Sequence, residues 1–165
     1  MKYDLEKTQT HNLSLDFHCC LKNYNQIIQS EDDDLDDLPS FFDDNVVAID
    51  LDCIERLRAS QLRQDQVSTM DTVFAISDLD QTEMLLVELR LNYKNLYNLN
   101  RNKLIAKVEG SISLLGNSVP INENYIFIFQ PNKKQEAINR IARMIPSLNS
   151  NYQVLDLNDL IRIYF

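Results

Sequence analysis

Three charged residues stand in or beside two apolar segments, at a spacing that could support metal-ion chemistry. Asp78 follows the β-rich run TVFAIS, and Glu88 and Arg90 belong to the alternating run MLLVELRLNY. Side chains two residues apart on a strand point to the same face, so Glu88 and Arg90 can reach one site. Carboxylates hold Mg²⁺ well, and a bound ion polarises a phosphate and lowers the pKa of water. The pattern therefore predicts Asp78 and Glu88 as metal ligands, with Arg90 at the phosphate.

The same residues also fit a purely structural interpretation. Glu88 and Arg90 would then form the polar face of a half-exposed strand, and Asp78 would be an ordinary turn residue. An acid and a cation at this spacing are common on strands, so the pattern alone has low specificity. Other chemistries find less support, because the chain has two glycines and lacks a phosphate-binding glycine loop, a GxSxG elbow and an HExxH helix.

Hydrophobic periodicity indicates the elements that must position these residues. Residues 72–78 and 84–93 are predicted to form a hairpin around the polar segment DLDQTE. Four other segments repeat apolar residues at helical spacing, and two short β-rich runs follow the last two of them. The predicted helices cover residues 14–29, 47–62, 100–115 and 131–145, and the further strands cover 124–129 and 152–157.

The order of these elements predicts the fold class. Asn100 is expected to cap the helix at 100–115, Gly116 to end it, and Gly110 to allow a close backbone approach within it. A strand-helix-strand step implies a right-handed crossover between parallel strands, whereas the hairpin is antiparallel. We therefore expect residues 1–165 to form one α/β (α+β) domain, with a mixed central sheet of about four to five strands flanked by four helices.

A helix, an antiparallel hairpin, a helix and a strand in this order resemble the core of the PD-(D/E)xK nuclease superfamily, over about residues 50–130. In that family an acid near the hairpin turn precedes an acid-x-Lys motif on the next strand. Many members carry a further acid on the preceding helix, where this chain has Glu55. The resemblance implies an Mg²⁺-dependent nuclease whose metal ligands are Asp78, Glu88 and Glu55.

The motif lysine of this family is replaced by Arg90. An arginine stays protonated, so it can hold a phosphate but cannot act as a base. The resemblance implies that Lys94 or Lys107 could supply the lysine from a neighbouring position, as happens in some members. The strongly acidic chain ahead of the site argues in the other direction, because it would repel a nucleic-acid backbone.

The net charge of −9 over 165 residues favours a different class of function, a protein-binding domain. Nucleic acid is disfavoured as a partner, because phosphate binding needs clustered Lys and Arg. Residues 31–44, EDDDLDDLPSFFDD, predict a solvated acidic loop that could steer a basic protein partner onto its apolar groups. In size and charge the chain resembles bacterial immunity proteins and antitoxins, here on a degenerate nuclease-like scaffold without a cofactor. The predicted contact residues are Asp32, Asp33, Asp34, Asp36, Asp37, Phe41, Phe42, Asp43 and Asp44.

The chain has an odd number of cysteines, three, at positions 19, 20 and 53, and none of them has CxxC spacing. They predict free thiols in a reducing cytoplasm rather than a disulfide framework or a zinc ribbon. His18, Cys19 and Cys20 are adjacent, and consecutive helical side chains diverge, so we expect packing rather than a shared metal ion. No apolar run has signal-peptide character or approaches the ~20 residues of a membrane span. The apolar tail LIRIYF could pack in the core or form a dimer contact.

Overall fold

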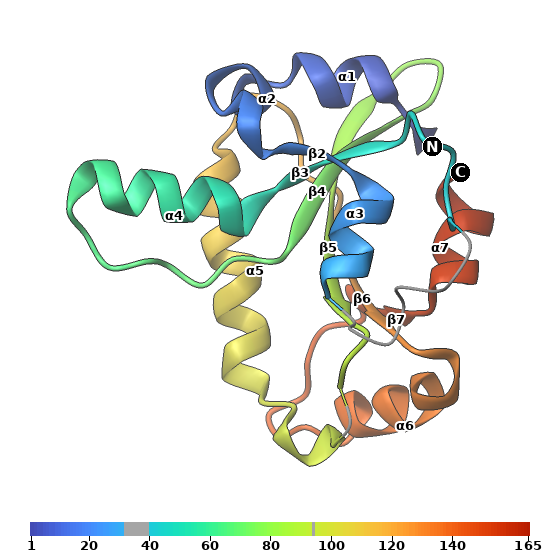
Figure 1. The fold of residues 1–165 in the computed structure, drawn as a ribbon. Helices are drawn as coiled ribbons and strands as arrows, with labels where there is room; N and C mark the ends of the chain where they lie inside the picture. The colour runs from blue at the N-terminus through green and yellow to red at the C-terminus, as the bar shows by residue number, and fades with distance from the viewer. Residues whose placement is uncertain (32–39, 94) are drawn as a thin grey trace.

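A mixed sheet of seven strands forms the centre of the computed structural model, which describes residues 1–31, 40–93 and 95–165 (Figure 1). Pairing is antiparallel as far as the hairpin and parallel between the last three strands. The predicted mixed α/β sheet is therefore confirmed, with more strands than expected. The sheet order is β2 (Leu21–Asn23), β3 (Val47–Asp50), β4 (Thr72–Ser77), β5 (Thr82–Arg90), β6 (Tyr125–Phe129) and β7 (Tyr152–Leu155), and β1 (Lys2–Tyr3) pairs with β4.

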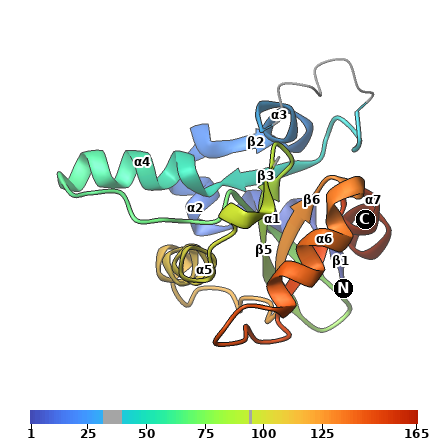
Figure 2. The ribbon, with the colours of Figure 1, turned by 90° about the horizontal axis from the view of Figure 1, so that it is seen from below.

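Helices cover both faces of this sheet, because side chains alternate along each strand and both sets are apolar. One core packs the sheet against α4 (Leu51–Leu62), α5 (Arg101–Leu115) and α6 (Pro131–Ala142). The second core packs the other face against α3 (Tyr24–Ser30) and α7 (Leu157–Tyr164). Figure 2 shows α5 and α7 on opposite sides of the sheet. Two short helices, α1 (Leu5–Thr10) and α2 (Asn12–Asp16), lie across one end of the strands.

The hairpin and α5 follow the sequence prediction closely. Asn100 caps α5 by accepting hydrogen bonds from two backbone N–H groups of the first turn, and Gly116 ends it with a φ of 65°. Gly110 approaches the backbone as expected. A Cβ at this position would lie 2.1 Å from the carbonyl oxygen of Ser68, which only the absence of a side chain permits.

Residues ahead of β4 depart from the prediction. The helix expected at residues 14–29 is broken into α2, the 3₁₀ turn η1 (His18–Cys20), β2 and α3, and residues 47–50 form β3 instead of the start of a helix. In each case a strand turns directly into a helix at a capping side chain. Asn23 accepts a hydrogen bond from the N–H of Gln26, and Asp50 accepts one from that of Cys53. Short apolar runs fit helical and extended periodicity equally well, so the pairing of β2 with β3 decides the conformation.

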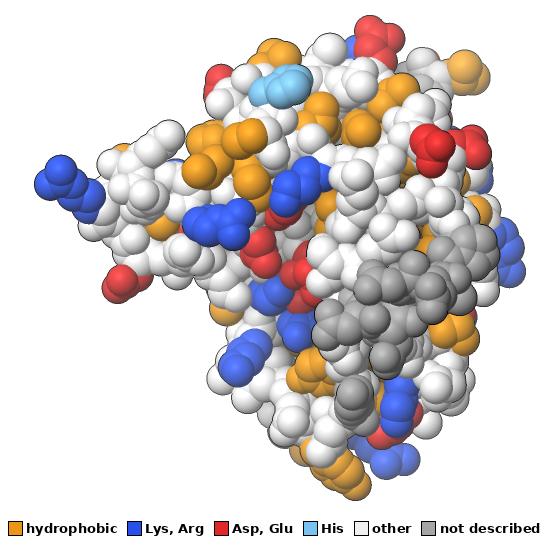
Figure 3. Space-filling view, viewed as in Figure 1, with side chains coloured by type: hydrophobic (Ala, Val, Ile, Leu, Met, Phe, Trp, Pro, Cys, Tyr) orange, Lys and Arg blue, Asp and Glu red, His pale blue; other side chains and the backbone are white. Residues whose placement is uncertain are grey.

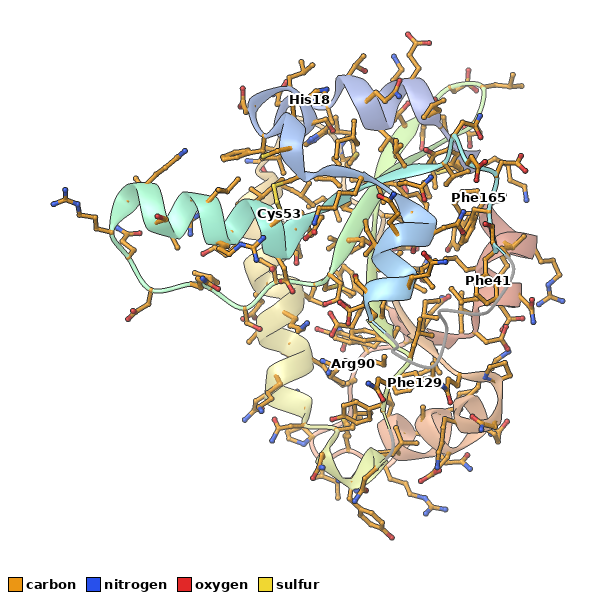
Figure 4. All side chains as sticks on the ribbon, in the orientation of Figure 1. His18, Phe41, Cys53, Arg90, Phe129 and Phe165 are labelled. Carbon is orange, nitrogen blue, oxygen red and sulfur yellow. A yellow bond between two sulfur atoms is a disulfide. The ribbon has the colours of Figure 1, made fainter. Side chains whose placement is uncertain are left out.

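The prediction of three free cysteines is wrong. Cys20 and Cys53 form a disulfide, and Cys19 is a free, exposed thiol. The β2–β3 pairing places η1 against the start of α4, so two residues that are distant in sequence meet (Figure 4).

The two ends of the chain lie side by side (Figure 1). The Nζ of Lys2 donates hydrogen bonds to the carbonyl oxygens of Arg162 and Ile163, and the ring of Tyr3 stacks on that of Phe165 with centroids 4.8 Å apart. The apolar tail thus packs within the molecule as part of α7. Within the described ranges, no helix combines the length and the apolar character needed to cross a bilayer.

Candidate functional site

A lysine from α5 joins two carboxylates at the end of the hairpin opposite its turn. The Nζ of Lys107 lies 3.0 Å from Oδ1 of Asp71 and 2.7 Å from Oε1 of Glu88. The Nη2 of Arg90 lies 2.7 Å from the same Glu88 oxygen. The other oxygen of Asp71 accepts a hydrogen bond of 2.6 Å from the backbone N–H of Leu89. We refer to Asp71, Glu88, Arg90 and Lys107 as the charged cluster.

The register of the hairpin brings the two carboxylates together. Thr72 pairs with Val87, so the next residues outward, Asp71 and Glu88, stand across from each other. Facing residues of an antiparallel pair project from the same side of the sheet, which here is the side covered by α5. Glu88 therefore continues the face of Met84 and Leu86, and its side chain meets α5 rather than solvent.

Two contacts fix α5 so that Lys107 reaches the carboxylates. The N–H of Met70 donates to Oγ of Ser111 at 2.7 Å, and that hydroxyl donates to the carbonyl of Lys107 at 2.8 Å. One residue earlier, Gly110 lets the helix backbone approach Ser68. The segment that leads into Asp71 is thus tied to the turn of α5 that carries Lys107.

Burial and neighbouring charges shift the pKa values of Glu88 and Lys107. Glu88 is only 1% exposed, and its burial, together with the negative charge of Asp71, raises its pKa to about 8 in spite of Lys107 and Arg90. Burial lowers the pKa of Lys107, but Glu88 and Asp71 outweigh it and the net pKa is raised. An acid with a raised pKa beside a cation is typical of functional sites.

Three further carboxylates surround the charged cluster. Burial and the charges of Asp71 and Asp52 raise the pKa of Glu31, at the end of α3, to about 7. Burial and Asp71 also raise the pKa of Asp52, although the hydroxyl of Thr69 donates to it at 2.7 Å. Asp50 caps α4 and forms an ion pair of 2.6 Å with Lys22. Figure 3 shows acidic side chains in the hollow between α4 and α5, with basic side chains on either side of them.

The predicted pairing of Asp78 with Glu88 is wrong. Asp78 lies in the hairpin turn, where its carboxylate accepts hydrogen bonds from the N–H groups of Asp80 and Gln81. Thr82 pairs with Ser77 beside this turn, and Glu88 lies six residues further along β5. At about 3.3 Å per residue the two acids are roughly 20 Å apart.

Glu55, the other predicted ligand, is also outside the charged cluster. Its carboxylate accepts hydrogen bonds from the Nε of Arg58 at 2.8 Å and from the N–H of Val67 at 2.8 Å. Asp52, one helical turn earlier on α4, is the residue of this helix that faces the cluster. Of the predicted cations, Arg90 and Lys107 reach Glu88, and Lys94 lies outside the described residues.

The residues predicted to bind a protein partner fall into three groups: those outside the described residues, those that are exposed and those that are buried or half-buried. Asp32, Asp33, Asp34, Asp36 and Asp37 lie outside the described residues, whereas Asp43 and Asp44 are exposed. The prediction that Phe42 contacts a partner is wrong, because it is 7% exposed and packs against the rings of Tyr24 and Phe165. Phe41 is half-buried, and the side-chain oxygen of Asn25 accepts hydrogen bonds from the N–H groups of both phenylalanines.

The donor set of the charged cluster fits a hard divalent cation. Carboxylate oxygens suit Mg²⁺ and Mn²⁺, and a cation would relieve the repulsion by Asp71 that contributes to the raised pKa of Glu88. Potential metal ligands are the side-chain nitrogen, sulfur and oxygen atoms of His, Cys, Asp and Glu. Among the described residues, only the three cysteines bring three such atoms within 4.8 Å of one another. The cluster therefore offers a pair of carboxylates rather than a closed cage. Mg²⁺ is commonly held in this way, with waters and substrate phosphates in the other positions.

Comparisons with protein-family models, with curated proteins and with solved structures found no match to this chain. The resemblance to the PD-(D/E)xK nucleases therefore stays a prediction.

Proposed function

We propose that this protein is a divalent-metal-dependent phosphodiesterase that cleaves nucleic acid, with Asp71 and Glu88 as its metal ligands. The observation that carries the proposal is the convergence of these two carboxylates on the Nζ of Lys107, next to Arg90. With Asp71 in place of Asp78, an acid directly before β4 faces Glu88-x-Arg90 on β5. That arrangement retains the resemblance to the PD-(D/E)xK nucleases.

Each residue of the charged cluster has a role in this proposal. A divalent cation at the two carboxylates would polarise the phosphate and lower the pKa of the attacking water. Lys107 would take the place of the motif lysine, with its ammonium group available to that water. Arg90 stays protonated and binds a phosphate oxygen, and its Nε is a donor that has no hydrogen-bond partner among the described residues. Glu88 would hold the cation in its carboxylate form, so binding of the cation would favour loss of the Glu88 proton.

The protein-binding function stays a prediction alongside this proposal. Most of the charge of the acidic loop lies in residues 32–39, outside the described residues, and the exposed Asp43 and Asp44 are consistent with a basic partner. The cytoplasmic location likewise stays a prediction.

The test is a cleavage assay on the full chain with fluorescently labelled single- and double-stranded DNA and RNA, in the presence of Mg²⁺ or Mn²⁺. The wild type should cleave at least one of these substrates. A metal ion contributes several kcal/mol to the transition state, so Asp71→Asn and Glu88→Gln should each reduce the rate by more than about 100-fold. Asp78→Asn is the matched control, an acid of the same hairpin, and should cleave at the wild-type rate.

Metal binding can be measured separately by thermal unfolding. A cation at 100 times its Kd stabilises the fold by about 2.7 kcal/mol, which corresponds to a rise of roughly 5–10 °C for a domain of this size. The rise should be present in the wild type and in Asp78→Asn and absent in Glu88→Gln. Absence of both cleavage and the thermal shift in the wild type would refute the proposal.

A further inference from the structure

Three cysteines meet where η1 packs against the first turn of α4. The sulfur atoms of Cys19, Cys20 and Cys53 all lie within 4.8 Å of one another. Cys20 and Cys53 are joined as a disulfide and are 0% and 6% exposed, whereas the thiol of Cys19 is exposed. A buried disulfide therefore has a solvent-accessible thiol within reach. Figure 4 shows Cys53 and the disulfide at the start of α4, beside the turn that carries His18.

We propose that these three cysteines form a thiol–disulfide exchange site, at which Cys19 connects the buried bond to low-molecular-weight thiols and disulfides in solution. Exchange proceeds by attack of a thiolate on a disulfide sulfur, so its rate depends on access to that sulfur. Solvent thiols have little access to Cys20 and Cys53, but Cys19 is open to solvent and close to both. This inference is independent of the proposed phosphodiesterase function.

Cys53 is the sulfur that Cys19 attacks. A bond between the adjacent Cys19 and Cys20 would close a small ring and distort the planar trans peptide that joins them. When the Cys19 thiolate attacks the sulfur of Cys53, a Cys19–Cys53 bond forms, the Cys20–Cys53 bond breaks, and Cys20 leaves as a thiolate that takes up a proton. The number of disulfides does not change in this step, so no oxidant or reductant is needed.

The second step transfers electrons from solution. An external thiolate attacks the exposed sulfur of Cys19, forms a mixed disulfide, and releases Cys53 as a thiolate. Cys53 stands in the first turn of a 12-residue helix, where the helix dipole stabilises a thiolate. A second external thiol then restores the Cys19 thiol and leaves as a disulfide. The protein bond is thereby reduced and two external thiols are oxidised, and oxidised glutathione would drive the reverse sequence.

The first experiment measures how fast glutathione reduces the disulfide in the full chain. Samples are quenched with acid at successive times, the free thiols are alkylated, and mass spectrometry counts the labels. Removal of Cys19 closes the accessible route, so Cys19→Ser should be reduced at least about tenfold more slowly than the wild type. His18→Ser, an exposed change one residue away, should react at the wild-type rate. Equal rates for Cys19→Ser and the wild type would overturn the proposal.

The second experiment asks whether Cys19 can bond to Cys53. The variant Cys20→Ser is reduced, freed of reductant and exposed to oxidised glutathione. We expect a Cys19–Cys53 disulfide, seen as the loss of both thiols without the added mass of glutathione. A stable glutathione adduct on Cys19 with a free Cys53 thiol would contradict the proposed geometry. The thermal unfolding transition of each variant confirms that it is folded.

Discussion

The carboxylates of Asp71 and Glu88 contact the same nitrogen atom, the Nζ of Lys107. The hairpin register forces the two acids together, and burial removes the water that would otherwise screen them. The charge of Asp71 therefore raises the cost of ionising Glu88, and the Nζ of Lys107 between the two acids partly offsets this cost.

The stability of the protein should fall as the pH rises through the titration of Glu88. Its pKa is raised from 4.5 to about 8 on folding, so between these values the folded chain holds a proton that the unfolded chain has lost. Stability is then lost as the pH rises toward about 8, and Glu88→Gln should flatten this dependence. Urea unfolding at intervals between about pH 5 and pH 9 measures it.

Two variants complete the pH experiment. Glu31→Gln should remove a smaller pH-dependent loss of stability. This loss is complete nearer pH 7, because the pKa of Glu31 is raised to about 7. Asp78→Asn, in the exposed turn, should leave the profile as it is in the wild type. An unchanged profile in Glu88→Gln would mean that Glu88 is ionised throughout this range.

Removal of Lys107 should destabilise the protein strongly and in a pH-dependent way. Loss of one partner from a buried ion pair costs about 3–5 kcal/mol, because the remaining charge is left uncompensated. The cost of Lys107→Ala should be larger at pH 8 and above, where Glu88 ionises, than at pH 5, where it is protonated. Chemical unfolding measures the difference, with the exposed Lys103→Ala on the same helix as the control. Equal costs at both pH values would contradict the assigned coupling.

Substitution of Gly110 should displace α5. The Cβ of Gly110→Ala would lie 2.1 Å from the carbonyl oxygen of Ser68, and that oxygen belongs to the backbone, so the two segments must separate. Overpacking of this kind costs about 1–3 kcal/mol, of which the better helix propensity of Ala recovers at most about 1 kcal/mol. Thermal unfolding should show a clear loss for Gly110→Ala and almost none for the exposed Ser113→Ala. A gain in stability for Gly110→Ala would show that α5 does not pack this closely.

Substitution of Phe42 should destabilise the protein far more than substitution of its neighbour Asp43. Phe42 is buried against two aromatic rings, and truncation of such a side chain costs about 3–5 kcal/mol. Asp43 is exposed, so Asp43→Asn should leave stability within about 0.5 kcal/mol of the wild type. Urea unfolding of Phe42→Ala and Asp43→Asn checks both values. A small effect of Phe42→Ala would return this residue to the candidates for partner contact.

The sequence predicted those elements whose signals are local. Clean alternation identified β5, and the capping residue Asn100 together with Gly116 bounded α5. The sequence analysis does not single out Asp71 as a partner of Glu88, although a turn centred near residue 79 implies that Glu88 pairs with a residue before β4 rather than with Asp78. The disulfide could not be predicted, because it depends on the pairing of β2 with β3, and no local pattern of Cys20 or Cys53 reports that pairing.

Because the two ends of the chain are in contact, its segments could be connected in a different order without a change of fold. Lys2 and Phe165 lie at the same corner of the molecule, so a short flexible linker could join the termini without disturbing the sheet. New termini could then be opened at the tip of the hairpin, where the side chain of Leu79 is fully exposed. Such a circular permutant would begin with β5 and end with β4, and would still bring Asp71 and Glu88 together through strand pairing alone.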